Sequence, residues 1–92
     1  MFKDKLVAEL TKELRDKLSA EDLDLLLEVA ADYAELTTRQ LAGEDVATEL
    51  EMIEASLAGL QAIAAEQAKT IIFSVARRIL SELLKGLILG AL

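Results

Sequence analysis

The clearest chemical pattern in the chain is a row of five carboxylates between positions 21 and 35. On a helix that turns 100° per residue they fall within about 80° of one another, opposite an apolar face. Such a row is typical of a solvated face, and it would also suit docking of a basic partner or mimicry of DNA. We treat it as a candidate partner-binding surface, with the solvated face as the simpler interpretation. This carboxylate row consists of Glu21, Asp24, Glu28, Asp32 and Glu35.

These acids do not indicate a metal site or a catalytic centre. The chain has no histidine and no cysteine, which removes the commonest general base and the usual transition-metal ligands. Di-iron bundles need Glu-x-x-His pairs, and the sequence holds no calcium-binding loop. The serines have no evident base beside them, and the four glycines are isolated. We expect no catalytic residue, no metal and no cofactor, and therefore a protein that is not an enzyme.

Charge is segregated along the chain. The net charge is +1 over residues 1–18, −11 over 19–68 and +3 over 69–92, which gives −7 in total. The acidic middle argues against direct nucleic-acid binding. The basic patch near the C-terminal end would pair with acidic side chains of a neighbouring copy or with anionic lipid headgroups, and the first needs no external partner. It consists of Lys69, Arg77, Arg78 and Lys85.

Two helices are expected in the first half of a single domain that covers residues 1–92. The first covers about 3–18, with an apolar residue at every fourth position. The second covers about 20–42. Ser19 followed by Asp22 predicts a capping box at its start, and Gly43 suits the left-handed residue that ends a helix.

A third, very long helix is expected from about residue 44 to 85 or beyond, forming an antiparallel hairpin with the second. Its apolar residues follow the 4-3-4-3-4 spacing of a coiled-coil seam. The sequence leaves open whether this helix breaks near Gly59 or Ala68. The seam consists of Val46, Leu50, Ile53, Leu57, Leu60 and Ala64.

The C-terminal segment carries more apolar surface than two short helices can cover. After Ala68, apolar doublets recur every four residues. Monomers rarely tolerate large exposed apolar patches, so we expect a helical bundle completed by oligomerisation. The residues expected at the interface are Leu57, Ala58, Gly59, Ala62, Ile72, Ile79, Leu83 and Leu87.

The predicted fold class is therefore all-α: an N-terminal helix plus a hairpin with one long helix. We expect a structural or interaction protein, a self-assembling homo-oligomer that acts as a scaffold or assembly component. The alternatives are a small acidic inhibitor that docks a basic partner through the carboxylate row, and a peripheral membrane protein that uses residues 69–92. No signal peptide or convincing membrane span is evident, so a cytoplasmic location is expected.

Overall fold

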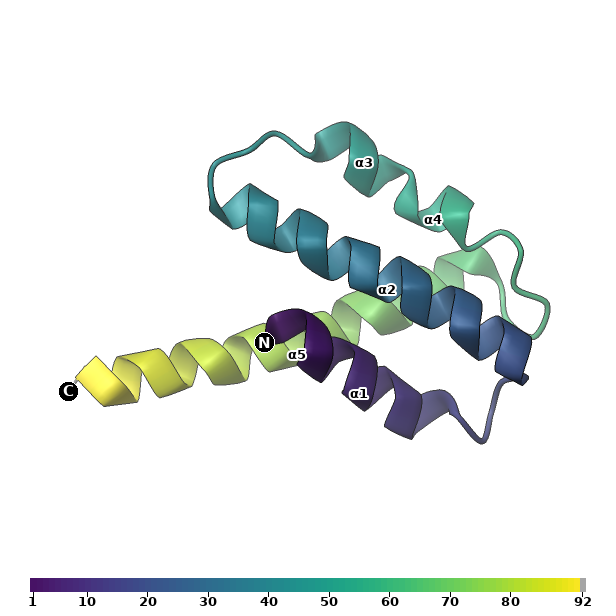
Figure 1. Ribbon diagram of the computed structural model, residues 1–92, viewed down its shortest axis with the longest axis horizontal. Helices are drawn as coiled ribbons and strands as arrows, with labels where there is room; N and C mark the ends of the chain where they lie inside the picture. Colours follow the sequence, from purple (N-terminus) through teal and green to yellow (C-terminus); the bar gives the residue numbers. More distant parts are fainter. Residues whose placement is uncertain (92) are drawn as a thin grey trace.

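Helices make up all the regular secondary structure in the part of the chain described, which confirms the all-α prediction. The computed structural model describes the backbone of residues 1–91 and the side chains of residues 1–86. In Figure 1, α3 and α4 return alongside α2, and α5 crosses behind α2 and runs next to α1. The elements are α1 (Phe2–Leu14), α2 (Ala20–Leu41), α3 (Ala47–Glu51), α4 (Ile53–Ser56) and α5 (Ala65–Ala91).

The first helix ends at Leu14, four residues before the predicted end at residue 18. The amides of Lys17 and Leu18 both donate to the carbonyl of Leu14, at 2.9 and 3.0 Å. This tight turn closes the helix and leaves room for the chain to reverse into α2. Leu6, Leu10 and Leu14 are buried, as the four-residue spacing predicts.

The two ends of α2 match the predicted signals. Ser19 is the N-cap, and its hydroxyl accepts a hydrogen bond of 3.2 Å from the Asp22 amide. At the other end Gly43 has φ +94°, a left-handed conformation that glycine adopts without strain. These local features let the chain reverse before α3.

The long third helix predicted from about residue 44 to 85 or beyond is interrupted, at one of the two places that the sequence leaves open. α3 and α4 have five and four residues, and residues 57–64 are not helical. Because the chain folds back here, Ile53 and Leu57 on one side and Ile72 on the other enter the same apolar core. A straight helix would leave one of these halves uncovered, so burial overrides helix propensity. The break includes Gly59, whereas Ala68 is buried inside α5.

The C-terminal part of α5 projects beyond the other helices (Figure 1). The helix has 27 residues, which corresponds to a length of about 40 Å at 1.5 Å per residue. The longest dimension of the molecule is 46 Å, so α5 spans most of it. Its N-terminal part supplies the core residues Ala68, Ile72, Ala76 and Ile79.

Candidate interaction surface

An aromatic pair joins α2 to α5 at the start of a surface groove. The rings of Tyr33 and Phe73 stack with their centroids 4.6 Å apart and an interplanar angle of 23°. The groove extends from this pair along the projecting part of α5 and has a volume of 520 Å³. We call it the α5 groove. It is lined by Tyr33, Phe73, Arg77, Leu80, Ser81, Leu84 and Lys85.

The α5 groove combines apolar and positive side chains because of their helical spacing. Phe73, Leu80 and Leu84 are separated by seven and four residues, so they lie on one face of α5. Leu84 is 58% exposed, which makes it one of the most exposed large apolar side chains in the described structure. Arg77 and Lys85 are exposed beside it. Such a surface fits a partner that is both apolar and acidic.

A second groove, between α2 and the α3–α4 segment, has the opposite charge. It has a volume of 360 Å³, and it contains Met52, which is 59% exposed. Its only cation, Arg39, pairs with Glu44 at 3.4 Å. We call it the acidic groove. It is lined by Asp32, Glu35, Leu36, Arg39, Glu49, Met52, Ile53 and Ser56.

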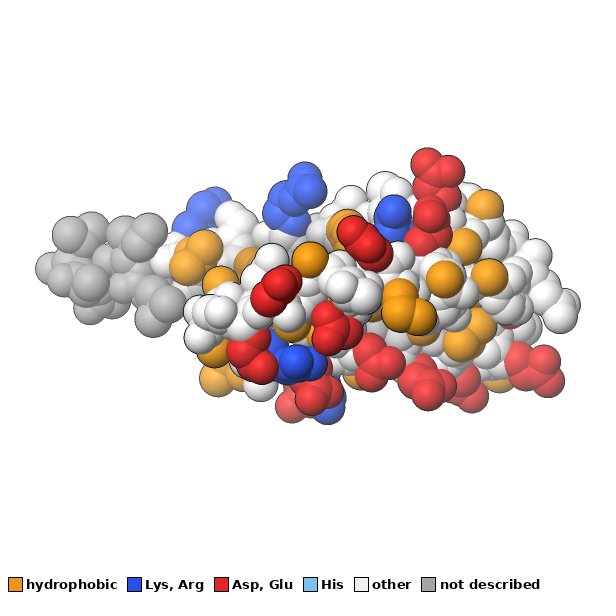
Figure 2. All heavy atoms as spheres, turned by 90° about the horizontal axis from the view of Figure 1, so that it is seen from above, with side chains coloured by type: hydrophobic (Ala, Val, Ile, Leu, Met, Phe, Trp, Pro, Cys, Tyr) orange, Lys and Arg blue, Asp and Glu red, His pale blue; other side chains and the backbone are white. Residues whose placement is uncertain are grey.

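All five members of the carboxylate row are exposed, as a solvated or docking face requires. Among the described residues none of them forms an ion pair. Asp32 and Glu35 line the acidic groove, whereas the other three lie outside it. In Figure 2, acidic side chains gather along one edge of the body, with some basic side chains among them, and other basic side chains stand out on the opposite edge near the projecting helix.

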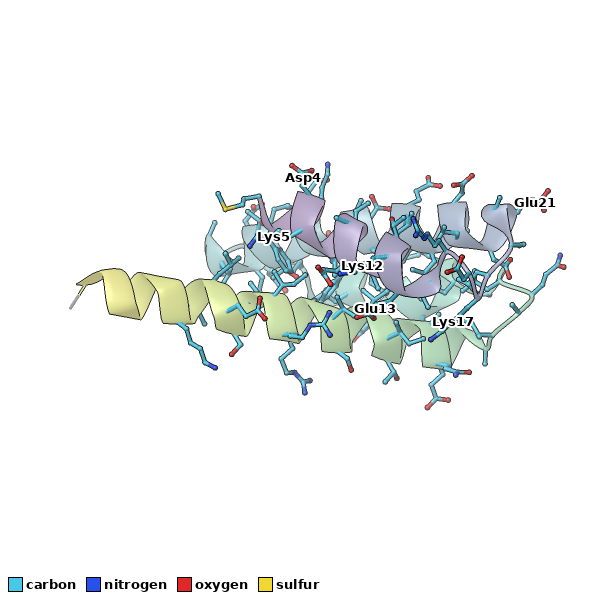
Figure 3. The ribbon with its side chains drawn as sticks, turned by 90° about the horizontal axis from the view of Figure 1, so that it is seen from below. Asp4, Lys5, Lys12, Glu13, Lys17 and Glu21 are labelled. Carbon is cyan, nitrogen blue, oxygen red and sulfur yellow. The ribbon has the colours of Figure 1, made fainter. Side chains whose placement is uncertain are left out.

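The predicted basic patch does not form one surface. Lys69 pairs with Glu54 of α4 at 3.6 Å. Arg78 pairs with Glu13 and Glu9 of α1, at 2.9 and 3.3 Å, and Glu13 lies on the side of α1 that faces α5 (Figure 3). The hydrogen bond and charge of Glu13 raise the pKa of Arg78 above its ordinary value, with a smaller contribution from Glu9. Only Arg77 and Lys85 belong to the α5 groove.

Three residues of the predicted oligomer interface are buried within the single chain. Leu57 and Ile72 are fully buried and Ile79 is 3% exposed, because they form the core of the single chain. Ala58, Gly59 and Ala62 are exposed in the 57–64 segment, and Leu83 is half-buried against the core. The side chain of Leu87 lies outside the described residues.

Asp22 has a role that the sequence does not reveal. It is only 6% exposed, and its carboxylate accepts hydrogen bonds from the backbone amides of Ala62, at 2.9 Å, and Gln61, at 3.2 Å. The capping box predicted that this carboxylate would reach back to the Ser19 amide instead. Its actual partners are 39 and 40 residues away, so local spacing could not identify them.

Sequence reasoning also missed the aromatic pair in the α5 groove. The chain has only one tyrosine and two phenylalanines, so the scarcity of aromatic rings was a signal that their positions mattered. Leu80 and Leu84 were visible as members of apolar doublets. Their spacing did not reveal that the other helices stop covering α5 near Leu80 and Leu84.

No other chemistry is visible in the described part of the molecule. Within it, no group of three or more acidic side chains is placed to hold a metal ion. None of its helices has the length and apolar character needed to cross a membrane. Comparison with protein-family models, with curated proteins and with solved structures finds no match to this chain. The two grooves and the exposed carboxylate row are therefore the surfaces from which a function can be argued.

Proposed function

We propose that this protein is a non-enzymatic interaction protein that assembles head to tail with copies of itself. The α5 groove of one copy docks on the acidic groove of the next, and the product is an assembly rather than a chemical reaction. The observation that carries this proposal is that the two grooves of one chain are complementary. One places Leu84 beside Arg77 and Lys85, and the other places Met52 among carboxylates.

Complementary charge and apolar contact would act together in this docking. Opposite potentials steer two surfaces into register, and burial of Leu84 and Met52 contributes roughly 25 cal/mol per Å² of apolar area removed from water. When each copy uses one groove toward each of its two neighbours, the contact is heterologous. Repetition of a heterologous contact yields a closed ring or an open filament, so the assembly suits a scaffold.

A charge-swap experiment tests the docking directly. Arg77→Glu with Lys85→Glu in one variant, and Asp32→Lys with Glu35→Lys in another, should each remove the head-to-tail assembly, because each places like charges across the contact. Mixing the two variants should restore a complex, because the reversed grooves are again complementary. Light scattering behind size exclusion would report the mass against the 10.0 kDa of one chain.

The matched control is Arg15→Glu with Lys17→Glu, which makes the same change of charge at exposed positions outside both grooves. This control should assemble like the unaltered chain. A monomeric unaltered chain at all concentrations would contradict the proposal. Binding of that monomer to anionic vesicles would instead favour a membrane role for residues 69–92.

A second candidate function is capture of a foreign basic protein through the carboxylate row. It is favoured by the exposure of Glu21, Asp24 and Glu28, which lie outside the acidic groove and have no ion-pair partner among the described residues. Asp24→Lys with Glu28→Lys should abolish binding of a basic test protein and leave self-association unchanged. If the variant and the unaltered chain bind the test protein equally well, these residues only form a solvated face of the helix.

A further inference from the structure

Residues 57–64 have the composition of a helix but do not form one. The segment contains three alanines, two leucines, an isoleucine and a glutamine, with Gly59 as the only poor helix former. No proline is present anywhere in the chain. Helix propensity alone would join α4 to α5 through this segment. The segment must therefore be held in its bent form by contacts with the rest of the molecule.

Two contacts hold the bend. The Asp22 carboxylate accepts hydrogen bonds from the Gln61 and Ala62 amides, which a continuous helix would use internally. Leu57 and Leu60, at 0% and 9% exposure, are buried from within the segment. The carboxylate thus replaces two of the helical hydrogen bonds that the bend removes. Loss of Asp22 would leave two backbone donors without their acceptor.

We propose that residues 57–64 are a hinge that Asp22 keeps closed, and that its opening exchanges α5 between two copies of this chain. In the open form, α3, α4 and α5 join into one helix from about residue 47 to 91. The α5 of each copy then packs on α1, α2 and α4 of the other copy. This inference does not depend on the head-to-tail docking proposed above.

The exchanged dimer keeps the contacts that α5 makes with the body of the closed monomer, and it loses those of the hinge itself. Ala68, Ile72, Ala76 and Ile79 would enter the partner's core just as they enter their own. Only the hinge changes, so its conformational preference and the protein concentration set the equilibrium between closed monomer and exchanged dimer. In the dimer the two hinges lie next to each other. There, the small side chains of Ala58, Gly59 and Ala62 allow the two backbones to come close.

Cross-linking between copies detects the exchange. Glu13 and Arg78 face each other across α1 and α5, and the chain has no cysteine of its own. A Glu13→Cys chain is mixed with an Arg78→Cys chain and treated with a short bismaleimide. A cross-linked heterodimer forms efficiently only when the α5 of one copy lies on the α1 of the other. A chain with both changes verifies the reach of the reagent, and an Asp24→Cys chain mixed with the Arg78→Cys chain measures random collisions.

Two further substitutions should move the exchange in opposite directions. Asp22→Ala removes the acceptor of the hinge and should raise the heterodimer yield about tenfold, while the exposed Asp24→Ala should not. Ala65→Pro should lower the yield about a hundredfold. Ala65 is the first residue of α5, where proline is tolerated, but in a continuous helix a proline there would break a hydrogen bond and clash.

The outcomes separate this inference from the proposed docking. The cross-linking experiment is repeated with Arg77→Glu and Lys85→Glu added to every chain, because these substitutions remove docking but leave the hinge intact. The heterodimer yield should again be highest for Asp22→Ala and lowest for Ala65→Pro. If Ala65→Pro is folded by circular dichroism and gives the same yield as the unaltered hinge, the exchange proposal is overturned. The Ala65→Pro test is decisive even if Asp22→Ala fails to fold. Absence of heterodimer above the collision control in every chain also overturns it.

Discussion

At the scale of single residues, the buried acid Asp22 differs from its exposed neighbours in the carboxylate row. Asp24 lies two residues further along α2 and faces solvent. Asp22 faces inward, where its carboxylate connects the start of α2 to the segment before α5. Hydrogen bonds to a charged group contribute more to stability than neutral ones, typically about 1.5–3 kcal/mol. One turn of one helix therefore holds both a structural acid and a solvated acid.

Asp22→Asn should lower the free energy of unfolding by about 1–3 kcal/mol, because the amide offers one acceptor oxygen and turns its own donors toward the backbone amides. The measurement is urea denaturation followed by circular dichroism. Asp24→Asn is the matched control and should stay within about 0.5 kcal/mol of the unaltered chain. Equal effects of the two substitutions would mean that the Asp22 hydrogen bonds add nothing to stability.

Ile79→Asp should unfold the single chain rather than only separate copies, because Ile79 is buried in the core. An unpaired buried carboxylate costs several kcal/mol, comparable with the whole stability of a domain of this size. Circular dichroism at low concentration should show loss of helix. Ser74→Asp, at an exposed position of the same helix, should keep its helix content. A folded, monomeric Ile79→Asp chain would contradict this account of the core.

At the scale of elements, α1 and α5 are joined by both apolar and charged contacts. Leu6 and Leu10 pack in the core that α5 completes, and Arg78 links α5 to Glu9 and Glu13 of α1. All three charged side chains are 38–50% exposed, so solvent and salt weaken their attraction. The apolar contacts therefore supply most of the stability of this pair, and the ion pairs set how the helices face each other.

Arg78→Ala should lower the melting temperature by a few degrees at low salt, and the difference should nearly vanish at high salt. Differential scanning calorimetry at two salt concentrations measures this. Arg15→Ala, at an exposed position without an ion pair among the described residues, serves as control and should change little at either concentration. A loss that persists unchanged in high salt would indicate that Arg78 acts through packing instead.

At the scale of the whole molecule, the projecting α5 is the main departure from a closed bundle. The body of the protein covers the first part of α5, and the groove around Leu84 remains open beside Arg77 and Lys85. The opposite charges of the two grooves and the net charge of −7 make any association of copies sensitive to ionic strength.

Self-association through the two grooves should weaken as salt rises from about 50 mM to about 500 mM, because screening reduces attraction between exposed charges. Sedimentation velocity at several protein concentrations would measure the change. Leu84→Glu should reduce association at both salt concentrations, whereas Leu41→Glu, at an even more exposed leucine outside the grooves, should not. Association that strengthens with salt would point to purely apolar contacts and contradict the charge-based docking.

The sequence by itself determined those features that depend on neighbours a few residues apart. The leucine spacing of α1, the Ser19 cap, the left-handed Gly43 and the exposure of the carboxylate row all follow from local geometry, and the structure confirms each of them. Helical periodicity and turn chemistry act within one or two turns, so a linear pattern contains the information that they need.

Only the tertiary structure decided where the long apolar segment bends and which of its residues are covered. The bend at 57–64 contradicts local propensity, and it exists because Leu57 and Ile72 are buried together in one core. The partners of Asp22 and Arg78 lie 39 to 69 residues away along the chain. Propensity differences are a fraction of a kcal/mol per residue, whereas burial of one large apolar side chain contributes about 1.5–3 kcal/mol, so the long-range contacts prevail.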